Sequence, residues 1–325
     1  MSRGNGLDPK QRRALAQSLT RILDASVEEA LAGLADAGPE PAQRLGMTGP
    51  PGAGKSMLIC RLAARRLERD RRIGVLAIDP TSPVSQGSIL GDRVRLETVA
   101  EHPAFYMRSV PSRRAHDGLC DNIADLLLTM EGFGFDDVVI ETVGVGQAEF
   151  AVRSLVDTVV LVLLPESGDT IQAMKAGILE TADVIVVNKA DLAGAGRIRN
   201  EVNTIIRRKK DDGGWLPPVI LTSAKEDTGI DELDDAVERH AAWLAGHRDA
   251  RATRRERARY RMQNLLLRRA DEVLDGTSAE LFDGALPQLF DRLVAGLKEP
   301  PEEISDNGPS GNRLSPRPPE EVSQE

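Results

Sequence analysis

Cysteines, histidines and aromatic residues are all scarce in this chain of 325 residues. The two cysteines, Cys60 and Cys120, are too few and too isolated for a disulfide framework or a zinc site. The four histidines are scattered and form no metal-ligand cluster. No apolar run approaches the roughly 18 residues of a membrane span, and the N-terminal segment lacks the apolar stretch of a secretory signal. We therefore expect a cytoplasmic protein with no membrane partner.

Positive charge is also in the minority. Lys and Arg number 42 against 51 Asp and Glu, which gives a formal net charge of −9. Because nucleic-acid-binding proteins normally carry a basic face, we expect no nucleic-acid partner. One stretch, residues 248–272, departs from this balance with nine arginines. It fits either a nucleic-acid contact or an amphipathic helix with a solvated basic face, and we favour the helix.

The central part of the chain, from about residue 44 to 246, alternates short β-branched runs with longer amphipathic stretches. The runs are continuous in apolar character, which is typical of strands buried on both faces of a parallel sheet. The expected strands of this kind are 73–78, 138–140, 159–164, 184–187 and 219–221, and a further short strand is expected at 44–48. We therefore predict an α/β fold with a mostly parallel sheet.

The two flanks differ from the centre in composition. Residues 1–43 form an N-terminal helical extension in this interpretation, because apolar residues recur at three- and four-residue steps over 8–38, until Gly38-Pro39. Beyond residue 247 the composition shifts to the arginine-rich stretch for which we favour a helix. The tail, 298–325, is acidic, holds six prolines and almost no apolar residues, and we predict that it is disordered.

The strongest local motif is a complete G-x-x-x-x-G-K-[ST] phosphate loop. Its residues, with the one that follows, are Gly49, Pro50, Pro51, Gly52, Ala53, Gly54, Lys55, Ser56 and Met57. Glycines allow the backbone N–H groups to wrap around phosphate oxygens, and the following helix adds its positive dipole end. Lys55 would reach the outer phosphates, and the Ser56 hydroxyl would coordinate magnesium. The motif does not choose between ATP and GTP.

A second motif selects guanine. Asn188, Lys189 and Asp191 belong to an NKAD sequence directly after the expected strand 184–187, where an open α/β sheet places its ligands. The Asp191 carboxylate can accept hydrogen bonds from the N1–H and 2-amino groups of guanine, a donor pair that adenine does not offer. Asn188 can tie this loop to the phosphate loop. Ser223, Ala224 and Lys225 end the next strand, where a backbone N–H can meet the guanine O6.

Acidic residues at strand ends predict a magnesium shell. Glu141 closes the expected strand 138–140, where GTPases usually carry Asp-x-x-Gly, and the Gly144 N–H can sense the γ-phosphate. Asp79 and Asp92 are two further candidates. Because magnesium prefers few carboxylates and several waters, not all three acids need bind it directly.

The residue after Gly144 is Val145, where Ras-like proteins carry the glutamine that orients the attacking water. Valine cannot do this, and Gln147 is a candidate substitute. The catalytic candidates are therefore Lys55, Glu141, Gly144 and Gln147. We predict a magnesium-dependent GTPase with slow intrinsic turnover, on the order of 10⁻³ s⁻¹ or below.

The motifs occur together and in order, with IDPTS at 78–82, GSILGDR at 87–93, ETVGVGQ at 141–147 and NKAD at 188–191. In this combination the chain closely resembles the MeaB/ArgK-type P-loop GTPases, a family of G-protein chaperones associated with methylmalonyl-CoA mutase. The resemblance spans about residues 10–270.

The resemblance implies a P-loop GTPase domain over 44–246 and a C-terminal helical dimerisation arm over 247–297, and hence a homodimer. It implies GTP-gated loading or protection of adenosylcobalamin in a cobalamin-dependent acyl-CoA mutase, either methylmalonyl-CoA mutase or a relative. It also implies an additional switch that contains Asp169 and Lys175.

Two segments depart from the family pattern, residues 83–86 and 109–118, and they leave the identity of the partner open. The alternatives are a GTP-dependent metallochaperone and a transport-system kinase. The chain lacks the His-rich motifs of nickel-delivering relatives, and we find no acceptor-binding motif for a kinase.

Overall fold

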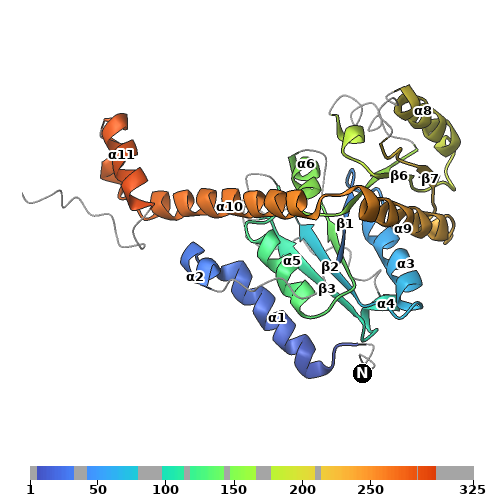
Figure 1. The fold of residues 1–325 in the computed structure, drawn as a ribbon, viewed down its shortest axis with the longest axis horizontal. Coiled ribbons are helices and arrows are strands. Elements are labelled where there is room, and N and C mark those ends of the chain that lie inside the picture. Colours follow the sequence, from blue (N-terminus) through green and yellow to red (C-terminus); the bar gives the residue numbers. More distant parts are fainter. Residues whose placement is uncertain are drawn as a thin grey trace, which may run out of the picture. The chain divides into compact units, whose positions relative to one another are not determined.

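The computed structural model describes residues 6–32, 42–79, 97–112, 118–142, 147–165, 177–208, 214–283 and 285–297. The chain divides into two compact units, and the boundary lies after Leu265. The first unit contains the sheet and the motif-bearing loops, and the second contains the C-terminal helices (Figure 1).

The first unit is built on a parallel sheet with the strand order β3-β2-β4-β1-β5-β6-β7 in the described part of the chain. Its strands are β1 (Gln43–Thr48), β2 (Ile73–Asp79), β3 (Phe105–Pro111), β4 (Asp137–Glu141), β5 (Thr158–Leu163), β6 (Val184–Val187) and β7 (Val219–Leu221). The predicted α/β fold is confirmed. The sequence prediction omitted β3, an edge strand that is only partly buried and carries Arg108 and Ser109 among its apolar residues.

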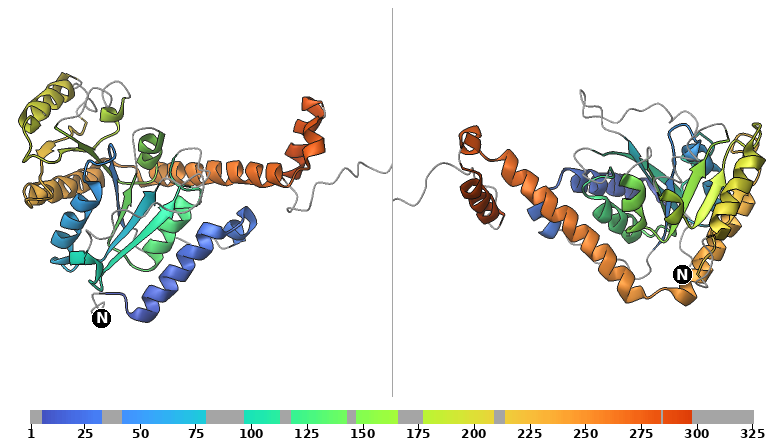
Figure 2. Two further views of the ribbon diagram at one scale, coloured as in Figure 1. Left: turned by 180° about the vertical axis from the view of Figure 1, so that it is seen from behind. Right: turned by 90° about the horizontal axis from the view of Figure 1, so that it is seen from above.

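Successive residues of a strand point to opposite sides of the sheet. Both sides carry apolar side chains here, and helices pack on both faces. On one face, Val160, Val162 and Val184 pack with α3 (Lys55–Leu67) and α9 (Ile230–His247). On the other face, neighbouring residues of the same strands pack against a second set of helices (Figure 2). This set comprises α1 (Pro9–Asp24), α5 (Ile123–Gly132), α6 (Gln147–Arg153) and α8 (Ala195–Arg208). Short elements complete the unit: α2 (Val27–Ala32), α4 (Glu97–Ala100) and η2 (Ile178–Glu180).

The N-terminal extension contains two helices where the sequence prediction had one. Asp8 caps α1 through a capping box with Gln11. The helix then stops, and Ser26 forms a second box with Glu29, with Ser26 N–H donating to Glu29 Oε2 at 2.8 Å. An S-x-x-E sequence favours the start of a new helix, and the second helix begins here. The apolar three- and four-residue spacing continues across the break between the two helices, which is why the sequence predicted one helix.

The arginine-rich stretch is helical, as predicted, and forms most of α10 (Ala250–Asp275). Up to Leu265 the helix belongs to the first unit, where its side chains contact other elements. Arg257 Nη2 lies 2.7 Å from Asp157 Oδ1, Arg261 pairs with Asp125, and Tyr260 packs against the core. Arg248, just before the helix, also pairs with Asp157.

The second unit contains the rest of α10, η3 (Ala279–Asp283) and α11 (Leu286–Gly296). Arg269 joins its two helices by donating hydrogen bonds to the carbonyl oxygens of Gly296 and Leu297 at 3.3 and 3.4 Å. The predicted disordered tail, 298–325, lies outside the described residues. Among the helices that are described, none is long and apolar enough to cross a membrane.

An aromatic cluster forms where α9 meets the start of β5 and β6. Trp215 lies 4.8 Å from His240 and 5.9 Å from Trp243 between ring centroids, and Trp243 stacks on His247 at 4.4 Å. His240 is buried and its Nδ1 lies 2.8 Å from Thr158 Oγ1. Burial lowers the pKa of His240, and the neutral ring packs between two tryptophans.

Candidate nucleotide-binding site

The predicted motif loops meet at the carboxyl edge of the sheet, where open α/β sheets bind ligands. The phosphate loop follows β1, the NKAD loop follows β6, and the Ser223–Lys225 loop follows β7. Glu141 and Asp79 are the last residues of β4 and β2. The sheet order places β1 between β4 and β5, so the phosphate loop lies centrally among them.

The phosphate loop depends on glycines with positive φ. Gly49, Gly52 and Gly54 have φ of +139°, +75° and +84°, a region that favours glycine. A Cβ on Gly49 would lie 2.2 Å from the carbonyl oxygen of Val162, and one on Gly54 would lie 2.5 Å from Asn188 Nδ2. Only glycine allows this loop to approach its neighbours so closely. The helix α3 begins at Lys55 and directs its N-terminal dipole into the loop.

Lys55 is buried, and its ammonium group lies within the loop that it follows. Its Nζ donates to the carbonyl oxygens of Gly49 and Pro50 at 2.9 and 3.0 Å. These contacts hold the cation over the curve of the loop, in a position suited to a phosphate.

Ser56 and Glu141 lie together although 85 residues separate them. The Ser56 hydroxyl donates to Glu141 Oε1 at 2.6 Å. The strand ends behind them are joined as well, because Thr142 Oγ1 donates to Thr48 Oγ1 at 2.9 Å and the Thr142 N–H bonds the Met47 carbonyl. A hydroxyl and a carboxylate are hard oxygen donors, and one or two such groups beside phosphates are what magnesium requires of a protein. The residues present therefore fit a magnesium ion.

Asn188 joins three loops. Its Nδ2 donates to the Ala53 carbonyl of the phosphate loop at 2.7 Å, the tie that the sequence suggested. Its Oδ1 accepts from Thr222 Oγ1 at 3.0 Å and from the Ala224 N–H at 3.3 Å. With only 2% of its surface exposed, Asn188 fixes the NKAD loop to both neighbours.

Asp191 is exposed beside this junction and is held by Ser223, whose hydroxyl donates to Asp191 Oδ1 at 2.8 Å. That hydrogen bond is the main reason why the pKa of Asp191 lies below its ordinary value, and the charges of Lys225 and Lys189 act in the same direction. The carboxylate therefore stays ionised at neutral pH and can accept two N–H donors. Lys189 has a φ of +57°, so the backbone turns sharply between Asn188 and Asp191.

Several predicted site residues lie outside the described part of the chain: Asp92, Gly144, Asp169 and Lys175. The departure at 83–86 also lies outside it, as do residues 113–117 of the departure at 109–118. Gln147 begins α6, but its side chain is not described. At the end of β2, the Asp79 carbonyl accepts from the Ser112 N–H at 3.0 Å, which joins it to the segment after β3.

Sequence reasoning missed the residues that support these loops. Thr48 and Thr142 were not among the predicted site residues, and they contact each other across 94 residues of sequence. Arg61, on α3, donates to the Ala224 carbonyl, 163 residues further along the chain. No local pattern in the sequence could have identified either contact.

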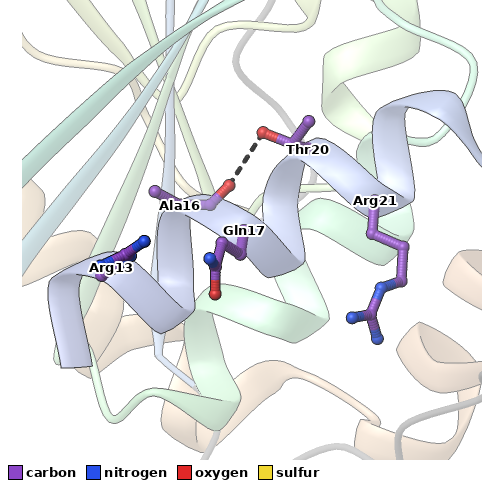
Figure 3. A pocket seen from close by; sticks show the side chains of 5 residues that line it. All are labelled: Arg13, Ala16, Gln17, Thr20 and Arg21. Atoms are coloured by element: carbon purple, nitrogen blue, oxygen red, sulfur yellow. Dashed lines mark hydrogen bonds between the residues drawn. The ribbon is translucent and has the colours of Figure 1, made fainter. Parts of the chain in front are cut away.

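A shallow hollow lies elsewhere, on α1, and its lining residues are Arg13, Ala16, Gln17, Thr20 and Arg21 (Figure 3). Within it, Thr20 Oγ1 donates to the Ala16 carbonyl at 2.9 Å. It includes none of the motif residues. No group of three or more His, Cys, Asp or Glu is placed to hold a metal within the ranges that the structure describes.

Comparison with known proteins agrees with this geometry. A Mycobacterium bovis protein named as a probable GTPase is 43% identical over 219 residues, which are 66% of this chain and 65% of that protein. A mouse protein named methylmalonic aciduria type A homolog, mitochondrial, is 37% identical over 229 residues, 69% of this chain and 55% of that protein. A crystal structure named LAO/AO transport system kinase shares the fold, with a TM-score of 0.56 and 22% identity over 88% of this chain and 98% of its own.

A family model matches residues 18–279, and its description is methylmalonyl-CoA mutase-associated GTPase MeaB. The prediction of a GTPase that binds guanine nucleotide is thereby confirmed, and so is the resemblance on which it drew. The motifs, the parallel sheet and this match together show that the chain belongs to the MeaB family of GTPases.

Proposed function

We propose that the protein binds GTP with magnesium, hydrolyses it slowly, and gates the loading or protection of adenosylcobalamin in a cobalamin-dependent acyl-CoA mutase. The observation that carries the nucleotide part is the Asn188 junction, which ties the guanine-selective loop to the phosphate loop. Phosphate and base recognition then act as one site.

Each part of the site has a role in this proposal. The N–H groups of residues 49–56 bind the phosphates, and Lys55 moves its cation from loop carbonyls to phosphate oxygens. Ser56 and Glu141 would hold magnesium, which neutralises charge on the outer phosphates when bound. Asp79 lies at the neighbouring strand end, where it could bind through water, and Asp92 completes the proposed shell.

Hydrolysis depends on the segment after β4. Gly144 would sense the γ-phosphate, and Val145 replaces the water-orienting glutamine of Ras-like proteins. Gln147, at the start of α6, is the proposed substitute. A slow chemical step of this kind suits a switch whose state a partner reads, and Asp169 and Lys175 would form an additional switch.

The proposed client is a cobalamin-dependent acyl-CoA mutase, and methylmalonyl-CoA mutase is the first candidate. The support is the family's own description as mutase-associated and the name of the mouse relative. The domain boundaries at 44, 247 and 298 and the cytoplasmic location are part of the same proposal.

We also propose a homodimer formed through the second unit. On α11, Leu286, Phe290 and Val294 follow one another at four-residue steps and are 76%, 64% and 41% exposed. Phe282 of η3 is exposed as well. A stripe of large apolar side chains facing solvent is costly unless another surface covers it.

The client is tested by a pull-down from native cytosol with the full chain held in GDP or in a non-hydrolysable GTP analogue. We expect recovery of an acyl-CoA mutase in an amount that depends on the nucleotide. Asp191→Asn protein, loaded with the same guanine nucleotides, is the control and should lose that dependence. Equal recovery in both states, or recovery of no cobalamin enzyme, contradicts the proposed client and leaves the GTPase assignment standing.

A further inference from the structure

Two arginines on α3 reach from the helix that follows the phosphate loop to the loop that follows β7. Arg61 Nε donates to the Ala224 carbonyl oxygen at 3.1 Å and lies 3.7 Å from Asp227 Oδ1. One turn later, Arg65 pairs with Asp227 Oδ2 and Asp231 Oδ1, both at 2.9 Å. Arg61 therefore contacts the backbone of the base loop, whereas Arg65 contacts only side chains.

The loop that they hold is short and closed. Ser223 and Thr228 exchange both backbone hydrogen bonds, at 3.0 and 3.1 Å, which leaves residues 224–227 as a tight turn. The Glu226 N–H bonds Ser223 Oγ at 3.2 Å, and Asp227 has a positive φ of +57°. These contacts fix the two ends of the turn, whereas the carbonyl of its first peptide accepts from Arg61, outside the turn.

That peptide joins Ala224 to Lys225. Its carbonyl points to Arg61, and in a trans peptide the N–H points the opposite way. The Lys225 N–H is thereby directed away from α3. The preceding N–H, of Ala224, already faces the Asn188 side chain of the NKAD loop. By holding the Ala224 carbonyl, Arg61 therefore fixes the direction of one further backbone donor, the Lys225 N–H.

We infer that Arg61 is a positioning residue for base specificity: by binding the Ala224 carbonyl, it aims the backbone N–H of Lys225 at the 6-oxo group of a purine. This inference rests on the proposed guanine-nucleotide site and adds the residue that sets one half of its selectivity. A carbonyl at C6 accepts this N–H group, whereas a 6-amino group presents a donor to a donor. Asp191 separately recognises the 2-amino edge.

The test compares Arg61→Ala with Arg65→Ala in the full chain, using GDP, IDP and ADP. Both substitutions remove a partly exposed α3 arginine that contacts the same loop, but only the first removes the carbonyl contact. For Arg61→Ala we expect Kd for GDP and for IDP to rise by the same factor, about tenfold, the size of one hydrogen bond, with ADP unchanged. Arg65→Ala removes hydrogen bonds to the side chains of Asp227 and Asp231 but none to the loop backbone, so it should leave the Kd for all three nucleotides within about twofold.

The nucleotides separate the inference from its alternatives. Because IDP keeps the 6-oxo group and lacks the 2-amino group, a larger loss for GDP than for IDP would show that Arg61 acts on Asp191, and the inference would be wrong. Equal losses for all three nucleotides, or for both variants, would indicate a merely structural role and would also overturn it. Failure of the unmodified chain to prefer GDP over ADP would instead contradict the proposed function.

Discussion

At the scale of single residues, the proposed choice of base rests on Asp191, an exposed carboxylate. Replacing it by Asn changes two acceptors into an acceptor and a donor, and the donor can pair with the 2-oxo group of xanthine. We expect Asp191→Asn to prefer XDP to GDP, with GDP affinity reduced by about 100-fold or more, the loss of a paired charged contact. Titration of the variant with both nucleotides measures this. Unchanged GDP affinity would remove the base-recognition argument.

At two glycines of the phosphate loop, substitution by alanine distinguishes the cost of backbone strain from the cost of steric overlap. At Gly52 an added Cβ meets nothing within 4 Å, so Gly52→Ala costs only the positive φ, about 1–2 kcal/mol of unfolding free energy. At Gly49 the Cβ would overlap the Val162 backbone, and we expect a loss of roughly 3 kcal/mol or more. Denaturant unfolding of the two variants without nucleotide tests the difference. Equal losses would mean that the loop can shift away from β5.

The residues also show where sequence reasoning stops. The glycines, Lys55, Asn188 and Asp191 could be placed from motifs, because their spacing is set by a loop that binds a ligand. Arg61 could not, since its partner is 163 residues away. The same holds for buried ion pairs such as Arg66 with Asp137 and Asp234, at 2.5 and 2.8 Å, whose charges look like surface residues in the sequence.

At the scale of elements, continuous apolar runs identified the buried central strands but not β3, whose partly exposed edge position breaks the run. The order of the strands was also beyond the sequence, because parallel strands are joined through helices and any order is compatible with the same runs. The apolar periodicity predicted helical structure in the N-terminal segment. The capping box at Ser26 marks the point at which the second helix begins.

The start of α10 is held to the sheet by one carboxylate. Burial alone would raise the pKa of Asp157, but the charge of Arg257, the Arg44 N–H and Arg248 outweigh it and lower that pKa. The pairing therefore stabilises the fold fully above the unfolded-state pKa, about 3.9, and is lost as pH falls through the lower folded-state pKa.

From this we expect Asp157→Asn to lower the free energy of unfolding by about 2 kcal/mol at pH 7. The difference from the unmodified protein should stay constant down to about pH 5 and narrow below about pH 4. Urea unfolding at a series of pH values measures it. A difference that grows in acid would have the wrong sign for a depressed pKa and would contradict the assignment.

At the scale of the whole molecule, the proposed homodimer depends on the apolar stripe of α11. Phe290→Asp puts a charge in the centre of that stripe, and we expect it to convert a dimer into a monomer because an unpaired charge cannot be buried cheaply. Light scattering after size-exclusion chromatography at micromolar concentration gives the mass. Gln288→Asp adds the same charge to an exposed position off the stripe and should leave the dimer intact. A dimer in both variants would locate the interface elsewhere.

The aromatic cluster at α9 gives the protein an intrinsic fluorescence signal. The chain has two tryptophans, Trp215 and Trp243, and both lie against His240. Its intrinsic tryptophan emission therefore originates from one place, the contact between α9 and the starts of β5 and β6. An emission change on nucleotide binding would report a rearrangement at this contact, on the edge of the sheet opposite the nucleotide loops, and it could be followed in real time without a label.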